Sequence, residues 1–228
     1  MNTMHPTGDV ALADPNASVA FPPAGVSVVV FDVVGTLVEP RPSVAVAYQR
    51  VAAQHGIQCD VAVIQQRFQA AWRRQEECDA TALPAFATNR DREAQRWQSI
   101  VEDVFDRVPE SNAIFTDLWK HFGLVEAWQP LERGRDLVRA ALDSGLTVAL
   151  ASNFDERLLA IAGQMEPLSW VPHIFTSSEI GWRKPAPEFF QWVERRFGCG
   201  PADMLLVGDD PELDFAAARR AGWRACRV

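Results

Sequence analysis

Several residue patterns that define common classes of protein are absent from this chain of 228 residues. The four histidines are scattered, without an H-x-x-x-H pair, which argues against a histidine metal site. No apolar run approaches the roughly 20 residues of a membrane span, and the N-terminal segment lacks the pattern of a secretory signal. The cysteines have no C-x-x-C spacing, so we expect free thiols in a reducing cytoplasm. They are Cys59, Cys78, Cys199 and Cys226.

Basic charge is also scarce. The formal net charge of -8 argues against the uniform attraction to phosphate backbones on which basic nucleic-acid binders depend. Nearly all basic residues are arginine, and the only lysines are Lys120 and Lys184. With 48% hydrophobic and 23% charged residues, the composition is that of a globular protein. We therefore expect a cytoplasmic protein with no nucleic-acid or membrane partner, whose oligomeric state the sequence leaves open.

Three apolar segments, each followed by polar residues, dominate what is present. They are "VVVFDVVGTL" (Val28–Leu37), "LTVALAS" (Leu146–Ser152) and "MLLVGDD" (Met204–Asp210). Runs that are apolar on both faces are typical of central strands in a parallel sheet covered by helices. The carboxyl ends of such strands form a ligand crevice, so we expect Asp32, Ser152 and Asp209 to converge there.

Helical periodicity separates these strands and predicts a doubly wound α/β fold. From residue 43 to residue 124 the apolar residues recur at i+3 and i+4 almost throughout, which predicts an all-helical domain inserted after the first strand. A break at residues 81–88 predicts a loop facing the other domain. The core is then expected over residues 26–42 and 125–228, after a flexible extension over residues 1–25.

The first strand ends at Asp32, a candidate nucleophile, because a carboxylate can attack phosphorus or carbon and form a covalent intermediate. Gly35 permits a sharp turn and Thr36 offers a hydroxyl to fix the loop. A helix or turn cap is the alternative role for Asp32. Two residues later stands Val34, in a place where a second acid would have assisted the first.

Two further segments offer groups that bind a phosphoryl oxygen. Ser152 and Asn153 supply a hydroxyl and an amide, and capping of the following helix is their alternative role. Lys184 lies in "RKPAP", where the flanking prolines stiffen the chain. It can neutralise charge on a nucleophile and on a transferred group, or it is simply a surface lysine.

The segment "GDDPELD" places Asp209, Asp210 and Asp214 within six residues. Carboxylates this close repel one another unless a cation compensates them, and oxygen ligands suit Mg²⁺. The alternative is an acidic helix N-terminus, which is stabilising without any metal.

Taken together, "DVVGT", Ser152, "KPAP" and "GDDPELD" resemble the four motifs of the haloacid dehalogenase (HAD) superfamily. The resemblance implies a Rossmann-like three-layer core, with a parallel sheet and a helical cap over the site. By position, it implies that Asp32 is the nucleophile, Ser152 a phosphoryl ligand and Lys184 the charge-neutralising lysine. Thr36 and Asn153 would contact substrate.

The same resemblance implies a Mg²⁺ site. Its ligands would be Asp32, the Val34 carbonyl, Asp209 and Asp210, and Asp214 would support them from behind. Most HAD phosphatases have a second aspartate where this chain has Val34, and general acid-base help is typically worth about 10²–10⁴ in rate. The segments "SNFDERL" and "TSSEIGWRKPAPEFF" resemble the corresponding segments of HAD-like hydrolase domain proteins that also lack this acid.

Several nearby residues are candidates for a replacement acid or for substrate ligands. Glu39 and Asp155 are the nearest titratable groups in sequence to the missing acid, and each has an ordinary loop or helix-start role as its alternative. Planar arginine forks suit a substrate anion, and most cap tryptophans are expected in the cap core. These cap residues are Trp72, Arg73, Arg74, Arg90, Arg92, Arg96 and Trp97.

The leading hypothesis is a Mg²⁺-dependent hydrolase of a small phosphorylated compound, acting through an aspartyl-phosphate at Asp32. The alternative is a weak or inactive HAD-like protein that binds a metal and an anion, which Val34 favours. A 2-haloacid dehalogenase is third, because the retained acids of "GDD" do not suit that chemistry. Activated leaving groups, such as acyl and aryl phosphates, should suffer least from Val34.

Overall fold

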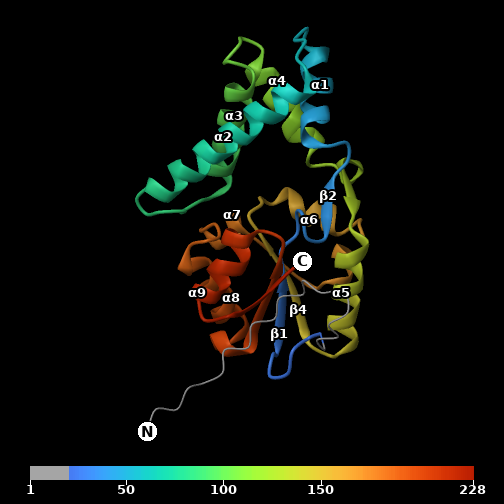
Figure 1. The fold of residues 1–228 in the computed structure, drawn as a ribbon, viewed down its shortest axis with the longest axis vertical. Helices are drawn as coiled ribbons and strands as arrows, with labels where there is room; N and C mark the ends of the chain where they lie inside the picture. Colours follow the sequence, from blue (N-terminus) through green and yellow to red (C-terminus); the bar gives the residue numbers. More distant parts are fainter. Residues whose placement is uncertain (1–20) are drawn as a thin grey trace.

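The structure is a computed structural model that describes residues 21–228. Residues 1–20 of the expected flexible extension therefore lie outside the described residues. The chain divides into a sheet-containing core and a group of helices at one end of it (Figure 1). None of the helices in the described range is both long and apolar enough to cross a membrane.

The core is built on one five-stranded parallel sheet. In spatial order its strands are β5 (His173–Thr176), β4 (Thr147–Ser152), β1 (Val28–Phe31), β6 (Met204–Gly208) and β7 (Arg224–Arg227). Strand β1 lies in the centre, with Val28 opposite both Thr147 and Met204. The last strand, β7, lies at one edge of the sheet.

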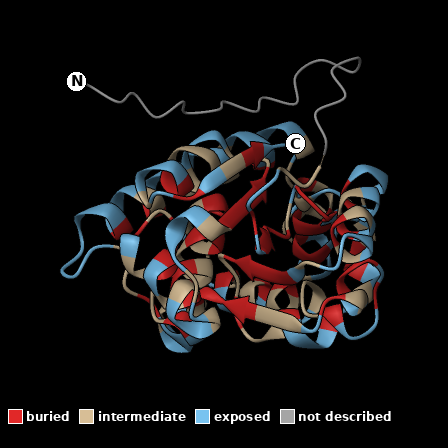
Figure 2. Ribbon diagram, turned by 90° about the horizontal axis from the view of Figure 1, so that it is seen from below, coloured by how far each residue is buried: buried red, intermediate tan, exposed pale blue. Residues whose placement is uncertain are grey.

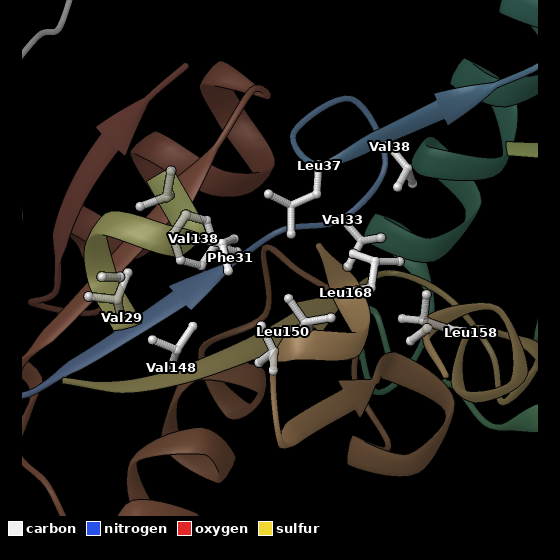
Figure 3. Packing of buried hydrophobic residues seen from close by; sticks show 14 of the residues in the cluster. Val29, Phe31, Val33, Leu37, Val38, Val138, Val148, Leu150, Leu158 and Leu168 are labelled. Carbon is white, nitrogen blue, oxygen red and sulfur yellow. The ribbon is translucent and has the colours of Figure 1, made fainter. Parts of the chain in front are cut away.

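Helices cover both faces of this sheet, because side chains alternate between the two faces along each strand. On one face Val29 and Phe31 of β1 pack in a cluster with residues of α5 and α6, which Figure 3 shows from close by. On the other face Val28 and Val30 pack in a cluster with residues of α7, α8 and α9. This three-layer arrangement confirms the α/β fold class.

The helices of the core are short to medium in length. They are α5 (Glu132–Asp143), α6 (Arg157–Ala162), α7 (Ser177–Ile180), α8 (Pro187–Phe197) and α9 (Ala217–Arg220). A turn of π-helix, η4 (Pro211–Ala216), precedes α9, and three 3₁₀ turns are η1 (Val125–Ala127), η2 (Leu168–Trp170) and η3 (Pro201–Asp203). Figure 2 shows buried strands between partly exposed helices.

The inserted segment forms a helical cap with a hydrophobic cluster of its own. Its helices are α1 (Val44–Gln54), α2 (Val61–Thr81), α3 (Arg90–Val104) and α4 (Ser111–His121). The antiparallel pair β2 (Val38–Pro40) and β3 (Trp128–Pro130) connects the cap to the core at the start and end of the insertion.

A second connection joins cap and core through the loop over residues 81–88. The backbone N–H of Thr88 donates to the Gly181 carbonyl, and that of Arg183 donates to the Phe86 carbonyl, both at 2.9 Å. This contact agrees with the expected loop facing the other domain. Beside it, the buried Glu93 carboxylate of α3 accepts hydrogen bonds from Arg183 at 2.8 Å. The cap therefore contacts the core through buried charges as well as through its linkers.

Candidate functional site

Polar side chains from three strand ends meet at the carboxyl edge of the sheet. Asp32 directly follows β1, Ser152 is the last residue of β4, and Asp209 directly follows β6. The Ser152 hydroxyl donates to Asp32 Oδ1 at 3.1 Å, and both residues are buried. The structure thus brings together residues that lie 120 positions apart in sequence.

Lys184 lies within this group rather than on the surface, with 1% of its area exposed. Its Nζ donates to Asp32 Oδ1 at 2.7 Å and to Asp214 Oδ1 at 2.5 Å. The Asn153 side chain holds the lysine's backbone, because it donates to the Lys184 carbonyl at 2.9 Å and accepts from the Lys184 N–H at 2.7 Å. The nitrogen and the oxygen of the Asn153 amide are therefore both used inside the protein, and its role toward substrate stays a prediction.

The charges of this group are strongly coupled. Burial alone would lower the pKa of Lys184, but the carboxylates of Asp214 and Asp32 raise it above its usual range. Burial raises the pKa of Asp214 to about 6, against the opposing effect of Lys184 and with the Asp32 carboxylate adding to the rise. One ammonium group does not neutralise all the carboxylates around it.

Three carboxylates form the candidate metal centre. Asp32, Asp209 and Asp214 each offer an oxygen, and these oxygens lie within 4.8 Å of one another. The donor set is all oxygen and carries excess negative charge, which fits a hard cation such as Mg²⁺. Asp210 is directed elsewhere, since its Oδ1 accepts from the backbone N–H groups of Glu212 and Leu213 at the start of η4. The part of the Val34 carbonyl in binding metal stays a prediction.

The turn after Asp32 fits closely around Asp209. Gly35 has a φ of +89°, and a Cβ added to it would lie 2.4 Å from Asp209 Oδ2, so only glycine is accommodated here. The Thr36 hydroxyl donates to Asp209 Oδ1 at 3.0 Å. Burial raises the pKa of Asp209, and the Thr36 hydrogen bond opposes that rise. Thr36 therefore orients a candidate metal ligand in this structure, and its contact with substrate stays a prediction.

Neither candidate for the missing acid is placed as a free proton donor. Glu39 is exposed on β2 and accepts from Gln129 at 2.5 Å. Asp155 is buried, and its two oxygens accept from the Arg157 guanidinium, each at 2.7 Å. Both oxygens of the Asp155 carboxylate are therefore occupied as hydrogen-bond acceptors.

A cavity of about 580 Å³ adjoins this group of residues, and Val34 and Asn153 contribute to its wall. Trp72 and Trp97, expected in the cap core, line the cavity and are half-buried. Sequence reasoning did not identify Phe115, Trp119 and Phe154 as cavity residues. The helical spacing of Phe115 and Trp119 in α4 indicates burial, but it does not distinguish packing against a helix from packing around a cavity. Phe154 lies between β4 and α6, outside any helical pattern.

Most of the cap arginines that were candidates for binding a substrate anion form ion pairs with carboxylates of the protein. Arg74 pairs with Asp103 and Arg90 with Glu156. Arg92 and Arg96 both contact the buried Asp79. Arg73 is the one member of that suspected group that lines the cavity within the described structure.

Comparison with known proteins identifies the family. The model of the haloacid dehalogenase-like hydrolases matches residues 26–222. The chain belongs to this family. It is 28% identical to the human haloacid dehalogenase-like hydrolase domain-containing protein 3 over 204 residues, which cover 87% of this chain and 80% of the human protein.

Two solved HAD structures share the fold. One is a defluorinating L-2-haloacid dehalogenase, Rha0230, with a TM-score of 0.69 and 20% identity over 89% of this chain and 80% of that one. The other is the magnesium-bound HAD-hydrolase YfnB from Bacillus subtilis, with a TM-score of 0.64 and 18% identity over 89% and 88% of the two chains. At these identities the likeness extends to the fold alone.

Proposed function

We propose that this HAD-like hydrolase is a Mg²⁺-dependent phosphohydrolase that acts on a small phosphorylated molecule through Asp32. The observation that supports this most is the position of Lys184, whose Nζ lies 2.7 Å from Asp32 Oδ1 in a buried setting. A fixed positive charge there lowers the repulsion between an attacking carboxylate and an anionic phosphoryl group.

The reaction proceeds in two displacements. A carboxylate oxygen of Asp32 attacks phosphorus, and the bond between phosphorus and the leaving oxygen breaks, with the electron pair departing on that oxygen. Water then attacks the phosphorus of the aspartyl-phosphate. The bond to Asp32 breaks, inorganic phosphate forms, and the water proton passes to solvent. Ser152, 3.1 Å from the nucleophile, is within reach of a phosphoryl oxygen in both steps.

Asp32, Asp209 and Asp214 would hold the magnesium ion, whose positive charge offsets the negative charge of the phosphoryl oxygens. Magnesium is also bound by YfnB, a protein of the same fold. Thr36 and Gly35 keep Asp209 in place within the turn, so this carboxylate is preorganised before any ion binds.

Val34 favours a second candidate, a protein that binds metal and anion without rapid turnover. It leaves the position of the second acid apolar, and the two nearby carboxylates are engaged elsewhere. Dehalogenation is third, because a cluster of three carboxylates gives that reaction no advantage while it favours a cation.

Release of phosphate from a panel of phosphate esters and acyl phosphates, with and without Mg²⁺, separates these functions. The wild type is expected to release phosphate only with Mg²⁺, and Asp32→Asn is expected to release none. Asp143→Asn, which changes an exposed aspartate of α5, is the matched control. Phosphate release that persists in Asp32→Asn would refute the mechanism, as would chloride release from 2-haloacids without Mg²⁺. Binding of Mg²⁺ without any turnover would favour the binding protein.

A further inference from the structure

The cavity between cap and core is strongly aromatic. Of its 20 lining residues, nine are aromatic and five are aliphatic. A volume of about 580 Å³ is within the usual range of small-molecule sites. The other six lining residues are polar or charged, so the wall is mostly apolar, and it favours a flat apolar group.

The rings around the cavity are not packed as a closed core. Trp72, Trp97, Phe115 and Trp119 are all half-buried. The Trp72 and Trp97 rings lie 5.6 Å apart at 56°, and the Phe115 and Trp119 rings lie 5.6 Å apart at 50°. Tilted ring pairs offer both faces and edges, the two surfaces with which another aromatic ring interacts favourably.

This cavity adjoins the candidate active site. Val34, two residues after the nucleophile, and Asn153, directly after Ser152, both line it. A substrate whose phosphoryl group lies at Asp32 therefore extends its remaining part toward the aromatic wall. The leaving oxygen lies between the two regions.

The wall near that oxygen supplies no acid. Val34 is aliphatic, and Asp155 is the one carboxylate among the residues lining this cavity in the described structure. Both Asp155 oxygens accept from Arg157, so it is held as an acceptor. A leaving group that departs without protonation must be a weakly basic anion, and an aryloxide, which delocalises its charge into a ring, meets this condition.

We infer that the substrates are aryl phosphates whose ring occupies this cavity, an inference that rests on the proposed phosphohydrolase function. Asp32 attacks phosphorus, the bond between phosphorus and the aryl oxygen breaks, and the electron pair leaves on that oxygen. The aryloxide then takes a proton from solvent. The same aromatic ring thus supplies the binding contact and the good leaving group.

Binding is measured first with compounds that contain a stable P–C bond and so need no turnover. Titration of the wild type, followed by tryptophan fluorescence and calorimetry, compares 2-naphthylmethylphosphonate with methylphosphonate in the presence of Mg²⁺. The naphthyl compound is expected to bind at least tenfold more tightly. Equal dissociation constants would overturn the inference.

Turnover is then compared between 2-naphthyl phosphate and acetyl phosphate, which has an activated leaving group but no ring. In Trp97→Leu the kcat/KM for 2-naphthyl phosphate, divided by the kcat/KM for acetyl phosphate, is expected to fall about tenfold. Trp170→Leu is the matched control, because Trp170 lies outside the cavity lining, against the core. Thermal unfolding checks that each variant is folded, and Phe115→Leu replaces Trp97→Leu if that variant is not.

The outcomes distinguish the two proposals. Asp32-dependent hydrolysis of acetyl phosphate, with no preference for naphthyl compounds, would overturn the aryl inference and leave the phosphohydrolase function standing. No hydrolysis of either phosphate would refute the proposed function, and the aryl phosphate inference with it. Selective naphthyl binding, together with a ratio that changes in Trp97→Leu and not in Trp170→Leu, would support both.

Discussion

Val34 is the residue whose side chain most directly limits the chemistry proposed for this site. Replacing it with aspartate supplies the missing general acid, so Val34→Asp is expected to raise kcat for poorly activated alkyl phosphates by about 10²-fold. Acetyl phosphate, which needs little protonation, should gain much less. Steady-state phosphate release with both substrate classes measures the difference.

Val34→Ala is the control, because it removes the same side chain without adding an acid. If Val34→Ala increases turnover as much as Val34→Asp, extra space and not protonation is responsible. A folded Val34→Asp variant that binds Mg²⁺ but shows no gain would contradict the missing-acid account.

Lys184 stabilises the fold as well as the proposed transition state. It is buried between Asp32 and Asp214, and removing one partner of such a group leaves uncompensated charge in the interior. Lys184→Met is expected to lower the free energy of unfolding by about 3–5 kcal/mol. Urea unfolding with a chelator present measures this loss.

The pairing with Asp214 is tested by a double-mutant cycle. Adding Asp214→Asn to Lys184→Met removes one of the stranded carboxylates, so the double variant should be more stable than the sum of the single changes predicts. A coupling of at least about 0.5 kcal/mol is expected for groups in direct contact. Strict additivity would show that the two side chains do not stabilise each other.

At the scale of elements, α3 is joined to the core by the buried pair of Glu93 and Arg183. Burial alone would raise the pKa of Glu93, but Arg183 and hydrogen bonds hold it below its usual 4.5. A carboxyl group with a lowered pKa stabilises the fold above about pH 4.5, and this contribution is lost as the pH falls further. Glu93→Gln should therefore cost about 3 kcal/mol at pH 7, and progressively less below pH 4.5.

Urea unfolding of wild type and Glu93→Gln between pH 7 and pH 3.5 measures this difference. Glu77→Gln, an exposed change on α2, serves as the control and should follow the wild type throughout. A gap between wild type and Glu93→Gln that is constant with pH would show that the Glu93 charge does not contribute.

Sequence patterns indicate elements better than they indicate the direction of side chains. The three apolar runs predict β1, β4 and β6, and the polar residues after them meet at one edge as expected. Within "GDDPELD" three aspartates are candidate metal ligands, and the sequence pattern does not show which of them face the site. The π-helical turn η4 decides between them, because it uses Asp210 as its cap and directs Asp214 toward Lys184.

The cap shows the same limit. Helical periodicity predicts that Trp72 and Trp97 are buried, yet it contains no information on the space between helices, so the cavity follows only from the packing. The buried pair of Glu93 and Arg183 is also absent from the sequence prediction, because the two residues lie 90 positions apart and no sequence pattern links them. Only the close approach of α3 to the residues before α8 removes them from water.

At the scale of the whole molecule, the proposed metal site would couple metal binding to folding. The chain has a net charge of -8, and three of its carboxylates offer oxygens within 4.8 Å of one another. Without metal these charges repel, so Asp209→Asn should be more stable than the wild type in the presence of a chelator. With Mg²⁺ at 100 times its dissociation constant, binding should stabilise the wild type by about 2.7 kcal/mol.

Asp209→Asn is therefore expected to be the more stable protein with a chelator, and the wild type the more stable protein with Mg²⁺. For a chain of this size a gain of about 2.7 kcal/mol corresponds to a rise of roughly 5–10 °C in Tm, and Asp209→Asn should rise much less because it has lost a ligand. Thermal unfolding of both proteins, with chelator and over a series of Mg²⁺ concentrations, measures this. If Mg²⁺ raised both Tm values equally, the ion would be acting away from Asp209, and the candidate metal centre would be refuted.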